Sequence, residues 1–276
     1  MIRSYTLAIL CAMVVLGNGR RISEDPSQKL LARRTRVIDG GEVSIENIPW
    51  QVNFINYWGR STIPGCSGSI ISSNWVITAG HCICSWAWDS LGPLIVLSAG
   101  SSHYKKGSHH TIVEVICHPQ YYLQDDKDLL PFNDIGLLRV AEPFKFDKTR
   151  QPIPLHSGAY EAMGQFEAIA SGWGSTTLDG QLSDNLKAAT FKVISSLDCL
   201  AFLSTVDKNS SAYSAKICAE PLSGSICQGD SGGPLTVNGT LVGIVSWGRS
   251  CSAKDGPQVF SEVAHYRDWI SEITSL

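Results

Sequence analysis

Short apolar runs, rich in β-branched and aromatic residues, recur along most of the chain and are separated by turn residues. They include residues 50–55, 67–71, 75–78, 94–97 and 111–116 in the first half, and residues 167–170, 189–194, 234–237 and 240–246 in the second. Many short strands joined by glycine-rich turns are typical of barrels and sandwiches, and closure into a barrel removes exposed sheet edges. We therefore predict an all-β fold.

One segment, near the C-terminus, has helical spacing instead. Its apolar residues share one side of a helix over residues 263–273, namely Val263, Tyr266, Trp269, Ile270 and Ile273. Apolar positions three and four residues apart are typical of an amphipathic helix. We predict that this helix docks on the β structure.

The N-terminus carries a short apolar segment. The run from Leu7 to Leu16 follows Arg3 and precedes the small residues Gly17 and Gly19. This arrangement predicts a secretory signal peptide over residues 1–19 and a secreted, extracellular protein. A membrane anchor is the alternative, but the run has only about half of the roughly 20 residues that a transmembrane helix needs.

Composition and charge exclude several classes of partner. Apolar residues make up 43% of the chain, charged residues 17%, and the net charge is -3. These values suit a globular protein and give no electrostatic reason to bind nucleic acid or an anionic membrane. His103, His109 and His110 lie in one segment, but no neighbouring Cys, Asp or Glu spacing completes a metal site. We expect a monomer without metal or other cofactor.

The cysteine count suits a secreted protein. Of nine cysteines, Cys11 is removed with the signal peptide, which leaves an even number. An even number of cysteines in an oxidising compartment predicts disulfides and not thiols or zinc ligands.

A basic segment separates the signal peptide from the β-rich region. Residues 20–36 are polar and end in Arg33-Arg34-Thr35-Arg36, directly before the apolar pair Val37-Ile38 and then Gly40-Gly41. We interpret residues 20–36 as an activation propeptide that is cleaved after Arg36. A solvated basic linker is the alternative.

Three stretches contain residues suited to nucleophilic catalysis: Thr78-Ala-Gly-His-Cys82, Asn133-Asp-Ile-Gly-Leu-Leu138 and Gly229-Asp-Ser-Gly-Gly-Pro234. A serine hydroxyl is a weak nucleophile, so it needs an imidazole to take its proton and a carboxylate to orient that imidazole. Alone, His81 could be a core histidine, Asp134 a cap, and the glycine-rich stretch a tight turn. Together, in the order His, Asp, Ser, they predict a triad of His81, Asp134 and Ser231.

These stretches resemble the chymotrypsin and trypsin family of serine proteases (peptidase S1), as do Arg36 to Gly41, Pro49-Trp50-Gln51-Val52, Ser171-Gly-Trp-Gly174 and Ser246-Trp-Gly248. The resemblance runs from Val37 to the C-terminus. It implies a protease domain over residues 37–276, made of two six-stranded antiparallel β-barrels packed face to face, with a crossover near residues 140–160 and a short C-terminal helix.

The resemblance also implies a function and the roles of individual residues. The protein would be a secreted serine endopeptidase in which Ser231 accepts the acyl group, His81 is the base and Asp134 orients it. The backbone N–H groups of Gly229 and Ser231 would form the oxyanion hole. An activating protease would cut after Arg36, and the new amino terminus of Val37 would pair with Asp230, so the precursor is inactive. Expected partners are protein or peptide substrates and proteinaceous inhibitors.

The disulfide pairing follows from the same resemblance. It implies three bonds and leaves two cysteines, which we predict to pair with each other. The four pairs are Cys66–Cys82, Cys199–Cys218, Cys227–Cys251 and Cys84–Cys117.

The substrate pocket departs from the trypsin pattern. The resemblance places Ser225 at the pocket floor, where trypsin-like members carry an Asp, so strict specificity for basic residues is not expected. The other expected pocket residues are Ile226, Ser246, Trp247, Gly248 and Gln258.

Two of these pocket residues are unusual for the family. Ile226 is bulkier than the usual residue, and Gln258 stands where most members have glycine. Gln258 would shorten the pocket and offer an amide, which favours uncharged side chains of medium size. Asp255, close in sequence, leaves a preference for basic side chains open.

Two other functions compete with the endopeptidase. Gly229-x-Ser231-x-Gly233, followed by Asp255 and His265, satisfies the α/β-hydrolase pattern, but Pro234 starts another β-type run where that fold needs a helix. A non-catalytic protease-like binding or regulatory protein is the second alternative. Such proteins usually lack a triad residue, and none is missing here.

Two sequons, at Asn209 and Asn238, are candidate N-glycosylation sites. The pair Asn238-Gly239 also predicts a hairpin turn between two strands.

Overall fold

The structure is a computed structural model that describes residues 41–58, 61–84, 95–123, 130–158, 166–175, 180–206 and 215–276. The expected signal peptide and propeptide, Arg36, Val37 and the sequon at Asn209 lie outside the described residues.

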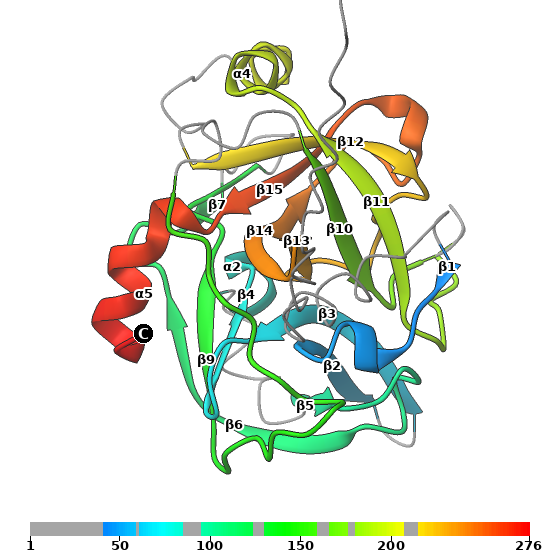
Figure 1. Cartoon of the computed structure of the whole chain (residues 1–276), viewed down its shortest axis with the longest axis vertical. Helices are drawn as coiled ribbons and strands as arrows, with labels where there is room; N and C mark the ends of the chain where they lie inside the picture. Colours follow the sequence, from blue (N-terminus) through cyan, green and yellow to red (C-terminus); the bar gives the residue numbers. More distant parts are fainter. Residues whose placement is uncertain are drawn as a thin grey trace, which may run out of the picture.

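Six strands of the first half close into one antiparallel barrel (Figure 1), in the order β2-β3-β4-β9-β6-β5. They are β2 (Gln51–Trp58), β3 (Ser61–Ile70), β4 (Trp75–Thr78), β5 (Ile95–Ala99), β6 (Ser108–Cys117) and β9 (Gly136–Val140). Their inward side chains, among them Phe54, Ile70, Leu97 and Leu138, form a fully buried core. The barrel forms because closure lets every strand pair on both edges.

Six strands of the second half form another barrel, in the order β11-β10-β13-β14-β15-β12, which closes because β12 also pairs with β11. They are β10 (Glu167–Gly172), β11 (Lys187–Val193), β12 (Lys216–Ser223), β13 (Pro234–Val237), β14 (Thr240–Trp247) and β15 (Gln258–Glu262). The core includes Phe191 and Phe260, whose rings meet edge-on with centroids 5.9 Å apart. The prediction of two six-stranded antiparallel barrels is confirmed.

The remaining elements are short. Strand β1 (Gly41–Glu42) pairs with β11, and β7 (Tyr122–Leu123) pairs with β8 (Pro131–Phe132). The helices within the described residues are α2 (Gly80–Ile83), α4 (Ser196–Ser204) and α5 (Arg267–Thr274), with 3-10 turns η1 (Ile45–Asn47), η5 (Ala253–Asp255) and η6 (Ala264–Tyr266). No helix within the described ranges is long and apolar enough to cross a membrane.

The short C-terminal helix is also confirmed, although its predicted range divides into η6 and α5. Ile270 is fully buried, and Trp269 and Ile273 pack against a core that includes residues of both barrels, such as Ile77 and Ile244. This third core joins the barrels and so fixes the position of residues that face each other across them.

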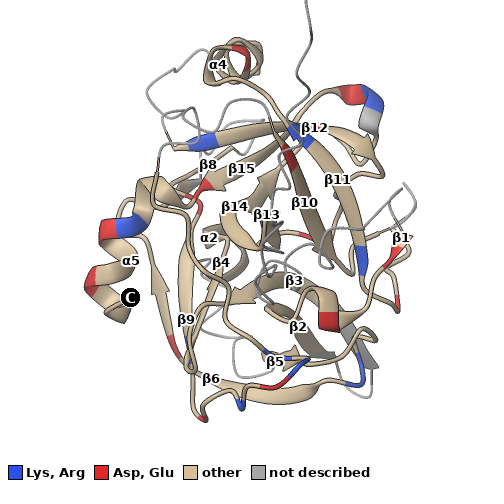
Figure 2. Cartoon of the chain, in the orientation of Figure 1, with Lys and Arg blue, Asp and Glu red and all other residues tan. Residues whose placement is uncertain are grey.

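Four disulfides join Cys66–Cys82, Cys84–Cys117, Cys199–Cys218 and Cys227–Cys251, the same pairs that the sequence led us to expect. Asn238 and Gly239 form the turn between β13 and β14, both with positive φ, as expected for an Asn-Gly hairpin. Charged side chains of both signs are scattered over elements of both barrels (Figure 2).

Candidate active site

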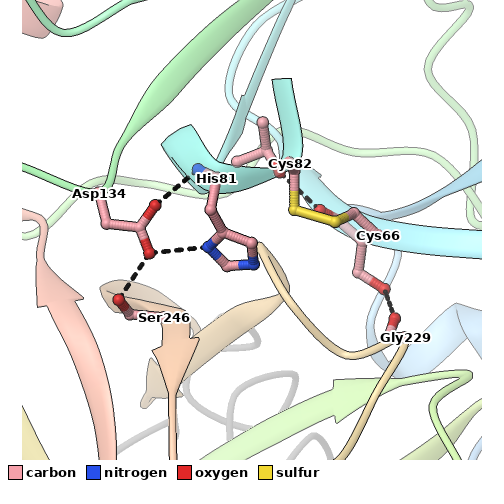
Figure 3. Close-up of a disulfide and its surroundings, with 8 residues drawn as sticks. Cys66, His81, Cys82, Asp134, Gly229 and Ser246 are labelled. Carbon is pink, nitrogen blue, oxygen red and sulfur yellow. Dashed lines mark hydrogen bonds and ion pairs between the residues drawn. A yellow bond between two sulfur atoms is a disulfide. The ribbon is translucent and has the colours of Figure 1, made fainter. Parts of the chain in front are cut away.

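His81 and Asp134 come together in the first barrel, where the end of β4 pairs with the start of β9. His81 lies in α2, directly after β4, and its Nδ1 is 2.9 Å from Oδ2 of Asp134 (Figure 3). The backbone N–H of His81 donates to the other carboxylate oxygen at 2.8 Å. Gly80 is required locally, because a Cβ there would lie 2.6 Å from the ring of Tyr121. The carboxylate thus fixes both the backbone and the ring of His81.

The second barrel adds two contacts to Asp134. Ser246 Oγ of β14 donates to Oδ2 at 2.6 Å (Figure 3), and Ser261 Oγ of β15 donates to the backbone carbonyl at 2.8 Å. Ser246 is also one of the expected pocket residues, and its side chain is buried and contacts the carboxylate.

These contacts determine the charge state of the pair. Burial raises the pKa of Asp134, but the charge and side-chain hydrogen bond of His81, the charge of Lys216 and the hydrogen bond from Ser246 together outweigh it, so the pKa lies below its ordinary value. Burial lowers the pKa of His81, but the Asp134 carboxylate outweighs this effect and raises it. With Nδ1–H committed to an ionised Asp134, Nε2 of the neutral imidazole is available as a base.

Ser231 comes from the second barrel, in the turn before β13. It is half-buried, and its carbonyl accepts a hydrogen bond from the backbone N–H of Ser67 at 2.7 Å, which ties the turn to β3 of the first barrel. Within the described residues, no hydrogen bond joins Ser231 Oγ to His81. Such bonds are often long without substrate and tighten when it binds.

The glycines around Ser231 permit close packing of this turn, against the second half at Gly229 and against the first barrel at Gly232. Gly229 has a φ of 95°, and a Cβ there would meet Gly174 at 3.0 Å. Gly232 has a φ of 78°, and a Cβ there would overlap Thr78 Oγ1 of β4. Ser67 Oγ also donates to the carbonyl of Gly229 at 3.3 Å, a contact that the sequence did not lead us to expect.

Asp230 is buried beside a cavity. Its carboxylate accepts the backbone N–H of Gly174 at 2.8 Å and of Cys227 at 2.9 Å. Burial raises its pKa to about 6, although the two N–H donors oppose this. The cavity measures about 490 Å³ and is lined by Gly172, Gly174, Lys187, Ala188, Ser225 and Asp230, among others. Gly172 and Gly174 are needed because a Cβ at either would overlap the carboxylate.

The expected pocket residues divide into two groups. Ser225 and Ile226 line the cavity beside Asp230, and Ile226 also packs into the second-barrel core. Gln258 is 2% exposed and lies against Gly248, where a Cβ would overlap its amide. The amide nitrogen donates to the carbonyl of Ser250 at 3.1 Å, so the Gln258 side chain is held in this position.

Two further residues of the pocket region are engaged at the surface. Trp247 stacks on Phe202 of α4, with ring centroids 6.5 Å apart. Asp255, which left a basic preference open, is exposed and accepts a hydrogen bond from Ser250 Oγ.

One group of three potential metal ligands lies together among the described residues, namely Cys66, His81 and Cys82. The two sulfur atoms form a disulfide (Figure 3), so they are not thiolates that could bind an ion.

Comparison with known proteins gives a consistent picture. The family model of trypsin matches residues 37–270. The chain is 31% identical to a trypsin of Phaedon cochleariae over 87% of this chain and 89% of that protein. It is 33% identical to trypsin 5G1 of Aedes aegypti, over 87% and 86% of the two chains. A crystal structure of a scabies mite inactivated protease paralogue, S-D1, superposes with a TM-score of 0.70 at 30% identity, covering 87% of this chain and 97% of that one.

Proposed function

The chain belongs to the trypsin family and is a serine-type endopeptidase, and we propose that it cleaves peptide bonds with Ser231 as nucleophile, His81 as general base and Asp134 as the residue that orients His81. The observation that carries the assignment is the buried contact of 2.9 Å between His81 Nδ1 and Asp134 Oδ2.

The reaction proceeds in two steps. Ser231 Oγ attacks the substrate carbonyl while His81 Nε2 takes the hydroxyl proton, and the imidazolium then gives this proton to the leaving amine. The acyl group remains on Ser231 as an ester. A water molecule, deprotonated by His81, then attacks this ester, and His81 returns the proton to Ser231 Oγ as the acid leaves and the free serine is restored. In both steps the backbone N–H groups of Gly229 and Ser231 bind the oxyanion.

We propose that the protein is secreted as a precursor and activated by cleavage after Arg36. The new ammonium group of Val37 would pair with Asp230, whose buried carboxylate borders a cavity of about 490 Å³. The backbone N–H groups of Gly174 and Cys227 already hold this carboxylate. Pairing would stabilise its ionised form and hence the turn that carries Gly229.

We propose that the enzyme prefers a small or medium uncharged residue before the cut bond. Gln258 lies against Gly248 and is held by Ser250, so it shortens the pocket. Ser225 supplies no carboxylate to pair with a substrate Lys or Arg.

A protease-like protein without turnover is the second candidate, because one structural neighbour is named an inactivated protease paralogue. This chain retains all three residues of the proposed triad, which favours the active enzyme.

Cleavage of a diverse peptide library tests these proposals. The precursor should be inactive, and the protein cut after Arg36 should cleave after small or medium uncharged residues. Ser231→Ala should abolish cleavage, whereas Ser204→Ala, at an exposed position of α4, should not. An inactive protein with a verified Val37 terminus would favour the candidate without turnover.

A further inference from the structure

A lysine is buried next to the proposed triad. Lys216 begins β12, is only 5% exposed, and directs its Nζ to two serine hydroxyls, Ser246 Oγ at 3.1 Å and Ser261 Oγ at 3.3 Å. A buried ammonium is costly unless it is paired and hydrogen-bonded. The residues that partner Lys216 therefore indicate what it does.

Both serine hydroxyls donate their single proton to Asp134. Ser246 donates to the side-chain Oδ2 at 2.6 Å and Ser261 to the backbone carbonyl at 2.8 Å. Each hydroxyl has one proton and two lone pairs, so each must accept from Lys216 Nζ. The direction of these hydrogen bonds is therefore fixed, from Lys216 through the two serines to Asp134.

We propose that Lys216 is a positioning residue that holds Ser246 and Ser261 in the orientation that fixes Asp134, and that its positive charge makes His81 a weaker base. The proposal rests on the proposed function of the triad. Lys216 acts through Asp134 and does not belong to the residues that line the cavity beside Ser225.

The burial of Lys216 and the charges around it determine the pH at which Lys216 loses its proton. Burial lowers the pKa of Lys216 to about 8, although the Asp134 carboxylate opposes this, so Lys216 is charged at pH 6 and largely neutral at pH 9. The charge of Lys216 also lowers the pKa of His81, against the larger effect of Asp134.

The two tyrosines near Asp134 keep one charge state across the assay. Burial, assisted by the Asp134 charge, raises the pKa of Tyr121 and of Tyr266 well above the ordinary value, so both stay neutral. Glu262 follows Ser261 in β15 and also acts on Tyr266. Among the groups that act on Asp134, Lys216 and His81 are therefore the ones expected to titrate between pH 5 and pH 9. Asp230, with a pKa of about 6, is not one of these groups.

Replacing the lysine by a neutral residue tests the proposal. In Lys216→Met, the acidic limb of kcat/KM should move to higher pH by about one pH unit, the size that a nearby charge commonly produces. At neutral pH kcat should fall while KM changes little. Lys216→Arg keeps the charge and should keep the limb in place. Lys106→Met, at an exposed position, makes the same change in net charge and should have no effect.

A titration of the His81 ring by NMR, in proteins that also carry Ser231→Ala, measures the pKa of His81 directly. This measurement does not depend on enzyme activity. The ring should protonate at higher pH in Lys216→Met than in the parent. If Lys216→Met does not fold, Lys216→Gln, which is neutral but keeps N–H donors, should show the same shift. An unchanged His81 titration in a folded neutral variant would overturn the proposal, even if the parent enzyme is active. A parent that does not react at Ser231 would instead contradict the proposed function.

Discussion

Replacing Gln258 by glycine should open the substrate pocket to large apolar residues. The Gln258 side chain is 2% exposed and lies against Gly248, so its removal frees space along that wall. Full burial of a Leu or Phe side chain contributes about 1.5–3 kcal/mol. If the new space accepts this side chain, kcat/KM for Phe relative to Ala before the cut bond should rise roughly 10- to 100-fold.

The assay compares peptides that differ only in the residue before the cut bond, Ala, Leu or Phe. Gln258→Met is the matched control, because it keeps the side-chain volume near that of Gln without adding a charge, and so should keep the discrimination against Phe. An unchanged ratio of Phe to Ala in a Gln258→Gly enzyme that still cleaves the Ala peptide would refute the assignment of Gln258 to the pocket.

Three other predictions concern the residues that support the site. In the precursor, burial raises the pKa of Asp230 from 3.8 to about 6, so the folded state favours the protonated carboxyl. Its contribution to the free energy of unfolding is fully present below pH 3.8 and is lost as the pH rises through 6. Chemical denaturation should show a loss of about 3 kcal/mol by pH 7 in the precursor and no such loss after cleavage behind Arg36. Equal pH dependence in the two forms would contradict the pairing of Val37 with Asp230. Ser246→Ala removes a hydrogen bond to the Asp134 carboxylate, which is worth about 1.5–3 kcal/mol. The kcat should therefore fall roughly 10- to 100-fold with little change in KM. A change in KM alone would contradict this role of Ser246. Ser67→Ala removes the hydroxyl that donates to the carbonyl of Gly229, whose N–H is a proposed oxyanion donor. Steady-state kinetics should therefore show a smaller loss of kcat, roughly 2- to 10-fold.

The fold could be predicted from the sequence because the apolar pattern within each segment agrees with the contacts that the segment makes with distant parts of the chain. The recurrence of short apolar runs between turn residues predicted the strands. Their grouping into two barrels was implied by the resemblance to the chymotrypsin and trypsin family. The Val263–Ile273 pattern predicted the docked helix, but not that its first turn is the 3-10 turn η6. Helix boundaries depend on the local hydrogen bonds, which the apolar pattern does not specify.

The support of the triad was not predictable in the same way. Lys216 begins a short apolar run, where a lysine is most simply solvent-exposed. Its environment depends on pairing with Ser261, far along the chain in β15, which places the Lys216 side chain against Asp134. Ile226 was singled out in the sequence only for its bulk at an expected pocket position, and it also joins the second-barrel core with Phe260. Both outcomes depend on tertiary packing and not on sequence neighbours.

The most direct test of the account is covalent labelling with an organophosphonate, located by peptide mass spectrometry. We predict a single adduct on Ser231 in the protein cleaved after Arg36, with little adduct in the precursor and none in Ser231→Ala. The rate of labelling should fall at low pH as His81 becomes protonated. Absence of an adduct in protein with a verified Val37 terminus, or an adduct at another residue, would contradict the assignment of Ser231 as the nucleophile.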